Sequence, residues 1–251
     1  MRILLIGGSG YVGTLVLPGL AQRHTVRVFD RKPPRQTAEP SSRDTGIEYV
    51  AGDATDLGAL GAAMAGVDVV IHCAMGSGDL DPVAGAAEAY DVNVKSVHLA
   101  LLAAHEAGVP HAVHISSLSI YRDLLDRDLD GEEPPDATDL YGLTKRLGEQ
   151  VCQAAAAQWG MTVNVLRLTW PTADADWPAW TRFGDRQLMR TGDGTLVEAT
   201  AASDLAAAIL AALEYRDGCQ TFLISGDRSA RRWSIRKAQR LLGWEPNFPP
   251  T

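Results

Sequence analysis

Short apolar runs recur along the chain and alternate with longer segments in which apolar positions follow a helical spacing. The runs predict strands at Ile3–Ile6, Thr25–Phe29, Ile47–Val50, Val67–His72, Ala112–Ser116, Val163–Leu168 and Thr221–Ser225. Most of these runs are continuous rather than alternating between apolar and polar residues. Continuous runs are typical of parallel strands whose two faces are both covered.

The intervening segments have the spacing of amphipathic helices. They predict helices at Tyr11–Arg23 (perturbed at Pro18-Gly19), Asp56–Ala65, Ala84–Ala107, Leu140–Trp159 and Ser203–Tyr215. Strands that alternate with helices indicate right-handed βαβ units. We therefore expect an α/β fold with a doubly wound, mostly parallel sheet.

Glycines follow the first predicted strand directly. Gly7, Gly10 and Gly13 are spaced G-x-x-G-x-x-G, and Gly8 with Gly10 and Gly13 also fits G-x-G-x-x-G. A glycine turn between a strand and a helix lets the backbone approach a pyrophosphate, and the helix N-terminus favours its negative charge. The pattern predicts a Rossmann-type dinucleotide site at Gly7, Gly10, Tyr11, Val12 and Gly13.

The second strand ends at Asp30, 17 residues beyond Gly13. An acid near this distance can accept hydrogen bonds from the adenosine ribose hydroxyls and repels a 2′-phosphate, which favours NAD over NADP. Arg31, Lys32 and Arg35 could neutralise such a phosphate, so NADP remains the alternative. An aspartate that merely starts a loop is the other interpretation of Asp30.

Further cofactor contacts are expected after the third and fourth strands. Asp56 is well placed to cap the next helix, which leaves Asp53, with Ala54, to meet the adenine. The small residues in Cys73-Ala74-Met75 would let the cofactor lie close to the strand end. His72 is expected to be a core histidine with its hydrogen bonds satisfied.

Charge and cysteine content narrow the function classes. With 251 residues and a net charge of −8, the chain is a poor candidate for binding nucleic acid or an anionic membrane. Its three cysteines have neither metal-site nor disulfide spacing, so we expect no metal and a cytoplasmic protein. The acidic segment 122–139 is interpreted as a solvated surface loop.

Candidate chemistry comes from Tyr141 and Lys145, which lie on one face at the start of a predicted helix. Ser116 and Ser117 end the fifth strand. A Tyr-x-x-x-Lys pair is common by chance and could be an ordinary amphipathic helix start. A serine at a strand end, followed by this pair and preceded by the glycine turn, favours a catalytic set.

With these residues the chain resembles the short-chain dehydrogenase/reductase superfamily, in its extended, NAD-dependent epimerase/dehydratase-like branch. The matching stretches are Gly7–Gly13, Asp30, Gly52-Asp53, His72-Cys73-Ala74, Asp91–Val94 with Asn93, Ser116–Tyr121, Tyr141–Lys145, Leu166–Leu168 and Leu242–Pro246. The resemblance implies a small-molecule substrate, residues 1–168 as the dinucleotide-binding core and 169–251 as a small substrate lobe interleaved with its last strand. It also implies a homodimer.

By this resemblance Tyr141 is the general acid/base, Lys145 lowers its pKa and holds the nicotinamide ribose, and Ser117 orients the reacting oxygen. The physics agrees: lowering a phenol pKa by ~3 units needs about 4 kcal/mol, which one ammonium ~4 Å away supplies at an effective dielectric of ~20. Two roles are open for Asn93: it could belong to a water relay beside the cofactor, or it could tie a helix to a strand.

Departures from the family narrow the reaction. Leu118 and Ser119 replace the Asp-Glu pair of the dehydratases, so we do not expect a dehydration reaction. About 80 residues follow Leu168, which favours a compact, sugar-like substrate. Met75, Ser117, Leu118 and Trp170 are the candidate substrate contacts, although the tryptophans could simply fill the lobe. The leading hypothesis is an NAD-dependent oxidoreductase acting on a secondary alcohol or ketone. The alternatives are a sugar epimerase and a non-catalytic dinucleotide-sensing regulator.

Overall fold

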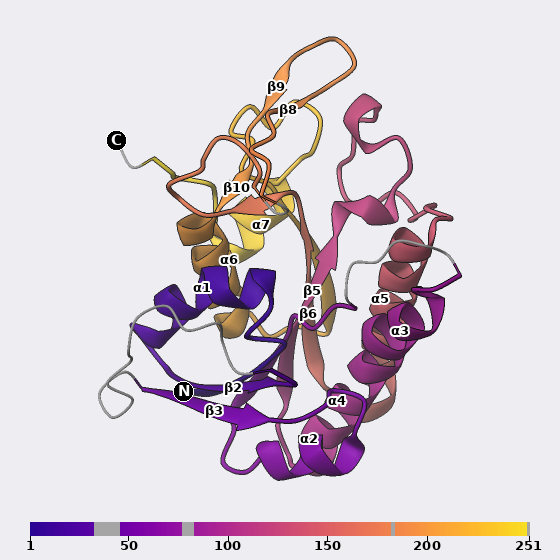
Figure 1. Cartoon of the computed structure of the whole chain (residues 1–251), viewed down its shortest axis with the longest axis vertical. Coiled ribbons are helices and arrows are strands. Elements are labelled where there is room, and N and C mark those ends of the chain that lie inside the picture. Colours follow the sequence, from indigo (N-terminus) through magenta and orange to yellow (C-terminus); the bar gives the residue numbers. More distant parts are fainter. Residues whose placement is uncertain (33–45, 77–82, 182–183, 250–251) are drawn as a thin grey trace.

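The computed structural model describes residues 1–32, 46–76, 83–181 and 184–249. A seven-stranded parallel sheet runs through its centre (Figure 1). Its strands are β1 (Arg2–Ile6), β2 (Thr25–Asp30), β3 (Ile47–Ala51), β4 (Val69–His72), β5 (His111–Ser117), β6 (Thr162–Leu168) and β11 (Cys219–Ile224). The order β11-β6-β5-β4-β1-β2-β3 reverses direction between β1 and β4, which confirms the doubly wound sheet.

Helices cover both faces of the sheet, as the alternating pattern predicts. They are α1 (Tyr11–Ala21), α2 (Leu57–Ala63), α3 (Ala86–Tyr90), α4 (Ser96–Glu106), α5 (Leu140–Trp159), α6 (Ala202–Glu214) and α7 (Arg236–Leu242). The helix expected over Ala84–Ala107 is divided, because a π-helical turn at Asp91–Lys95 separates α3 from α4. Pro18 lies inside α1 without ending it.

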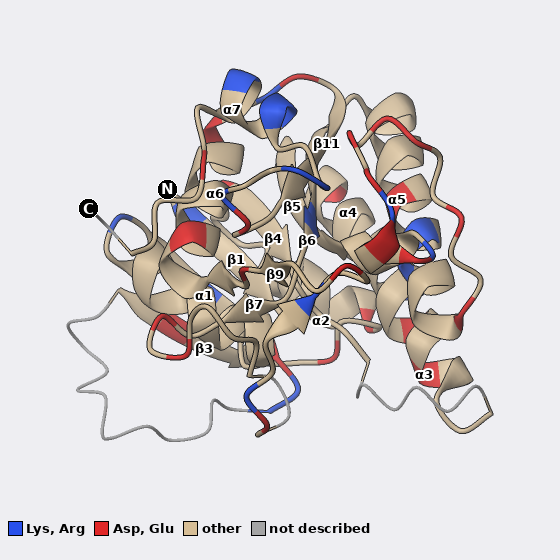
Figure 2. Ribbon diagram, turned by 90° about the horizontal axis from the view of Figure 1, so that it is seen from above, with Lys and Arg blue, Asp and Glu red and all other residues tan. Residues whose placement is uncertain are grey.

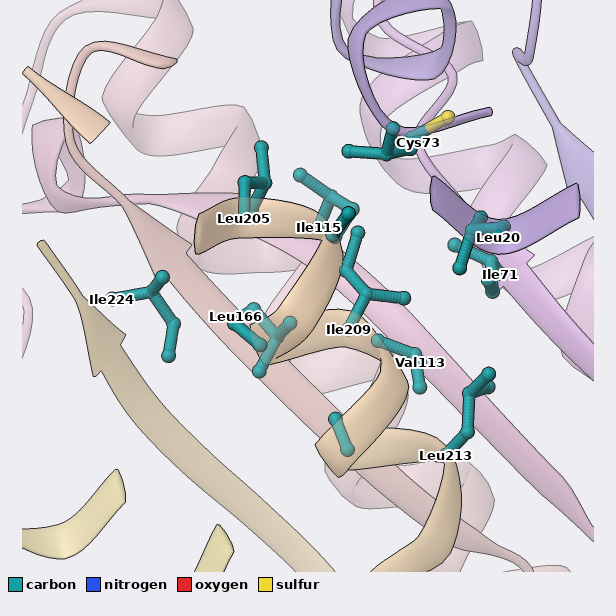
Figure 3. Packing of buried hydrophobic residues seen from close by; sticks show 14 of the residues in the cluster. Leu20, Ile71, Cys73, Val113, Ile115, Leu166, Leu205, Ile209, Leu213 and Ile224 are labelled. Atoms are coloured by element: carbon teal, nitrogen blue, oxygen red, sulfur yellow. The ribbon is translucent and has the colours of Figure 1, made fainter. Parts of the chain in front are cut away.

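Two apolar cores lie on opposite faces of the sheet. On one face α6 packs Leu205, Ile209 and Leu213 against strand residues such as Val113 and Leu166 (Figure 3). The other core lies between the sheet and the helices α2, α4 and α5. Burial on both faces explains why the strand sequences are continuously apolar.

Between β6 and α6 the described chain is mostly irregular and contains four short strands. They are β7 (Pro171–Thr172), β8 (Met189–Arg190), β9 (Leu196–Val197) and β10 (Thr200–Ala201). β7 pairs with β10, and β8 with β9. This segment projects beyond the carboxyl edge of the sheet, next to the loops that follow β5 (Figure 1).

The charged segment 122–139 is partly packed rather than fully solvated. Asp136 accepts hydrogen bonds from Arg122 and Arg127, and Leu129 forms a bridge with Trp233 of the C-terminal segment. Helix α7 carries Lys and Arg residues (Figure 2), and Lys237 on this helix pairs with Glu132 at 3.8 Å. Residues 33–45, which include Arg35, lie outside the described residues.

Candidate active site

A cavity of about 450 Å³ extends along the carboxyl ends of the strands. Such crevices are where open α/β sheets bind ligands. The predicted residues that line it are Gly7, Gly10, Tyr11, Val12, Asp30, Arg31, Asp53, Ala54, Cys73, Ala74, Met75, Ser117, Tyr141, Lys145 and Trp170. The structure thus brings together residues from seven segments that are far apart in the sequence.

The glycine turn is built for close backbone contact. Gly7 has a φ of +80°, and a Cβ there would lie 2.5 Å from the backbone of Ala74. Gly13 does not line the cavity; a Cβ there would lie 2.5 Å from Gly8, so Gly13 packs the first turn of α1 against the glycine turn. Gly10 caps α1 without a side chain. The turn therefore fits the pyrophosphate of a dinucleotide.

Asp30 closes one end of the cavity. Its carboxylate accepts hydrogen bonds from the backbone N–H groups of Ser9 at 3.0 Å and Lys32 at 3.2 Å. The neighbouring Arg31 pairs with Glu88 of α3 at 3.1 Å. An adenosine ribose placed against the glycine turn would meet the Asp30 carboxylate at the end of β2.

The residues after β3 and β4 form the floor beside Asp30. Asp56 caps α2 by accepting from the N–H of Ala59, as predicted. Asp53 accepts the N–H and the hydroxyl of Thr55 at 2.8 Å each, and these bonds hold the pKa of Asp53 below its usual value. Cys73 is buried against the Ile6 carbonyl, and burial raises the pKa of its thiol to about 12.

Ser117, Tyr141 and Lys145 meet at the opposite end of the cavity. Asp139 caps α5 by accepting from the N–H of Gly142, and a Cβ on Gly142 would lie 2.4 Å from the Ser119 carbonyl. This close packing brings the first turn of α5, with Tyr141, to the end of β5. The Lys145 ammonium is buried and donates to the Ile115 carbonyl at 3.0 Å.

A buried ion pair supports this end of the sheet. Arg167 on β6 contacts Glu149 on α5 at 2.8 Å, and the Ser116 hydroxyl donates to the same carboxylate at 2.6 Å. Arg167 also donates to the Tyr121 hydroxyl. The network ties β5, β6 and α5 together directly beneath Ser117 and Tyr141.

Two predicted site residues are placed elsewhere. Leu118 is fully buried and packs in a cluster with Ile120 and Trp233, so it faces away from the cavity and is not a substrate contact. Its neighbour Ser119 lines the cavity instead. Asn93 is buried in the π-helical turn and donates to the Thr144 hydroxyl, a tie between this turn and α5.

Other lining residues were not singled out from the sequence. They are Ser9, Phe29, Lys32, Gly52, Gly76, Val92, Ile115, Ser116, Ser119, Leu124, Leu168, Thr169, Pro171 and Trp180. Most of them adjoin a predicted site residue, so the strand-end positions could have found them. Leu124 and Trp180 come from irregular segments whose path no local pattern indicates.

Two buried histidines lie behind Lys145. His72 bonds Ser96 through Nε2 at 2.8 Å, while its Nδ1 and both ring nitrogens of His114 have no hydrogen-bond partner among the described residues. The two rings are 5.3 Å apart. Burial, together with the Lys145 charge, lowers the pKa of His72 to about 3 and that of His114 well below its usual value.

A model of the NAD dependent epimerase/dehydratase family matches residues 3–224. The chain belongs to this family. Among curated relatives, a 3-beta-hydroxysteroid dehydrogenase of Mycolicibacterium neoaurum is 31% identical over 66% of this chain and 46% of its own length. A NAD-dependent glucose-6-phosphate dehydrogenase of Haloferax volcanii is 34% identical over 59% of this chain and 60% of its own. The chain thus spans about half the length of such family members.

Solved structures of family type share the fold. Uronate dehydrogenase from Agrobacterium tumefaciens is 23% identical, with a TM-score of 0.76 over 98% of this chain and 84% of its own. UDP-glucuronic acid 4-epimerase from Bacillus cereus, solved with NAD, is 21% identical, with a TM-score of 0.78 over 98% and 91%. At these identities the likeness establishes the α/β architecture alone.

The described residues contain neither a candidate metal site nor a helix that could span a membrane. No group of three or more His, Cys, Asp or Glu among them could hold a metal ion. None of the helices in the described ranges has the length and apolar character needed to cross a membrane.

Proposed function

We propose that the protein is an NAD-dependent oxidoreductase that acts on a secondary alcohol or ketone of a small, sugar-like substrate. The observation that carries this proposal is one continuous cavity with Asp30 and the glycine turn at one end and Ser117, Tyr141 and Lys145 at the other. Residues 169–251 would contribute the substrate lobe above it. The non-catalytic regulator is disfavoured because Tyr141 and Lys145 both face the cavity.

The glycine turn, Asp30 and Asp53 would hold the cofactor, whose nicotinamide supplies a carbon that accepts a hydride from the substrate C–H. Ser117 accepts from the Ser119 N–H at 3.1 Å, so its own hydroxyl can donate to the substrate oxygen. Tyr141 takes the hydroxyl proton as the substrate is oxidised, and returns it on reduction. The Lys145 cation, held by the Ile115 carbonyl, stabilises the phenolate that results.

Replacing the phenol tests this assignment. Tyr141→Phe should lower kcat by roughly 10²–10⁴-fold, since a positioned acid/base contributes about that much. Its affinity for NAD should stay within about twofold of the wild type, measured by calorimetry. Turnover is followed as NAD reduction at the nicotinamide absorbance with a panel of sugars, sugar acids and polyols.

Tyr215→Phe is the matched control, because the Tyr215 hydroxyl donates to Asp217 at the surface and Tyr215 is not among the residues that line the cavity. It should leave both kcat and NAD affinity unchanged. Full activity in Tyr141→Phe would remove Tyr141 from the chemistry. Failure of the wild type to bind NAD would reject the proposed cofactor.

An epimerase is the second candidate, favoured by the family match. In that reaction the hydride returns to the opposite face of the same carbon, so NADH does not accumulate. Interconversion of two stereoisomers without a rise in nicotinamide absorbance would select this function.

We also propose a cytoplasmic homodimer. The described cysteines Cys73, Cys152 and Cys219 are free thiols, as suits a reducing compartment. The resemblance to the family supports a dimer contact through the helices before and after Ser117, which are α4 and α5. Light scattering of the purified protein would test the dimer, and a monomer at micromolar concentration would reject it.

A further inference from the structure

We propose that the substrate is an uncharged cyclic polyol, of the size of a free monosaccharide, whose C–H face lies against Trp170. This inference rests on the proposed function and specifies its substrate class. It is carried by the backbone of Trp170, by the side chains that brace its indole, and by the distribution of charge along the cavity.

Trp170 has an unusual backbone. Its φ is +29°, and within the described chain only Asp123 and Ala230 join it as non-glycine residues with positive φ. A bulky side chain in this region is strained, and such strain persists where surrounding contacts impose it, often at ligand sites. Trp170 directly follows β6 and lines the cavity. The strain is thus located at the wall of the site.

The indole of Trp170 is braced from behind by two other segments. The Trp233 ring lies 5.4 Å away at 57°, and Trp233 is 1% exposed. The Trp233 indole N–H donates to the carbonyl of Leu124, and Leu124 also lines the cavity. Trp170 is therefore a preformed, rigid aromatic wall, the kind of surface that binds a ring at low entropic cost.

Hydroxyl groups line the same end of the cavity. Ser117 and Ser119 end and follow β5, and Tyr141 starts α5 beside them. The end that holds the acid/base pair thus offers both an apolar aromatic surface and hydrogen-bonding hydroxyls. A cyclic polyol has the matching character, since its C–H groups form apolar faces while its hydroxyls project from the ring.

The charged lining residues lie elsewhere. Asp30, Arg31, Lys32 and Asp53 follow β2 and β3. In the sheet order, β2 is three strands from β5, about 14 Å at ~4.8 Å per strand.

Lys145 is the one charged residue among those described that lines the Trp170 end, and the proposed function commits it to the acid/base. Arg167 nearby is paired with Glu149. A buried carboxylate or phosphate is stabilised by a cationic partner or by backbone N–H groups at a glycine turn or helix N-terminus. The glycine turn lies at the cofactor end, and the described lining offers the Trp170 end no cation besides Lys145, which favours an uncharged ligand.

A substrate panel tests the charge. The wild-type protein is assayed for NAD reduction with D-glucose, D-galactose, D-xylose and myo-inositol, and with D-glucuronate, glucose 6-phosphate, UDP-glucose and cyclohexanol. At least one uncharged polyol should exceed every other compound by tenfold or more in kcat/KM. A preference for a charged compound or for cyclohexanol overturns the inference and leaves the proposed function standing. NAD binding without oxidation of any polyol also overturns the inference, whereas absent NAD binding rejects the proposed function itself.

Variants of Trp170 test the wall with the best polyol. Trp170→Ala should raise KM by tenfold or more with a smaller change in kcat, and Trp170→Phe, which keeps a ring, should raise KM less. NAD affinity should be unchanged in both. Trp177→Phe is the matched control, because Trp177 packs on Phe248 and lies outside the cavity lining. An unchanged KM in Trp170→Ala overturns the proposal. If Trp170→Ala does not fold, Trp170→Gly replaces it, because glycine also relieves the positive φ, and an unchanged KM in that variant overturns the proposal.

Discussion

At the residue scale, we expect the choice between NAD and NADP to depend on the Asp30 carboxylate. Two backbone N–H groups fix its position at the end of β2, at 3.0 and 3.2 Å. A fixed negative charge there repels the 2′-phosphate of NADP while it can accept the hydroxyls of NAD. The exposed pair of Arg31 with Glu88 is worth only ~0.2–1 kcal/mol, so it restrains the arginine weakly.

We therefore predict that Asp30→Asn narrows the preference for NAD over NADP by about tenfold, or about 1.4 kcal/mol. The amide keeps the acceptor for the Ser9 N–H but removes the charge. Dissociation constants for both cofactors, measured by calorimetry, give the ratio. Asp68→Asn, an exposed aspartate that accepts from the Arg2 N–H, is the control and should leave the ratio unchanged. Tighter binding of NADP than of NAD by the wild type would contradict the prediction.

At the scale of elements, the layer between the sheet and α5 contains more polar groups than an apolar core would. His72 and His114 face each other from β4 and β5. Gly148 on α5 packs closely on this layer, since a Cβ there would lie 2.7 Å from the Asn93 carbonyl and 3.4 Å from His114 Nε2. Both imidazoles are held neutral beside the Lys145 cation.

This arrangement predicts acid lability. The folded-state pKa of both histidines lies below the unfolded value of about 6.5, so the unfolded chain binds protons first as the pH falls. Stability should be full above about pH 6.5 and should decline from there toward pH 3, by an amount on the order of a few kcal/mol. Urea unfolding at pH 7.5, 6.5 and 5.5 measures the decline before most carboxylates titrate.

Removing one imidazole should flatten that pH dependence. His114→Leu keeps an apolar volume on β5 without a group to protonate, so its stability should fall less between pH 7.5 and 5.5. His98→Leu alters an exposed histidine on α4 and should retain the wild-type slope. Equal slopes in His114→Leu and the wild type would show that His114 is not responsible.

For the whole molecule, one tyrosine joins the cofactor turn to the irregular segment above it. The Tyr11 hydroxyl lies at the start of α1 and is within hydrogen-bond distance of the carbonyls of Pro171, at 2.8 Å, and Thr181, at 3.2 Å. Tyr11→Phe should lower the free energy of unfolding by about 1 kcal/mol.

The same variant should speed amide hydrogen exchange over residues 171–181, measured by mass spectrometry. Tyr49→Phe, at an exposed tyrosine of β3, is the control; identical exchange in Tyr11→Phe and the wild type would refute the link.

The strand-and-helix frame could be predicted because most strands of the sheet are apolar on both faces and several helices have a glycine or a capping residue at one end. Asp56 illustrates this, since its helix cap depends on residues three positions apart. The residues expected to hold the cofactor and to act as acid/base line one cavity, because parallel strands end at one edge of the sheet.

The walls of the substrate end could not be predicted in the same way. Leu118 is buried and Ser119 lines the cavity instead, because Leu118 packs in a cluster with Trp233, which is distant in sequence. The division of the long helix by a π-helical turn has no local signal either. These features depend on packing between segments, which a single sequence does not display.

The brace behind Trp170 has an evolutionary consequence. Trp170, Trp233 and the Leu124 carbonyl come from three separate segments, yet each holds the next in place. A mutation at one of them changes the fitness effect of mutations at the others, so substrate range would diverge through coupled substitutions rather than single steps. The proposed acid/base pair on α5, Tyr141 and Lys145, lies outside this coupled set, so it can stay constant while the residues of the brace change.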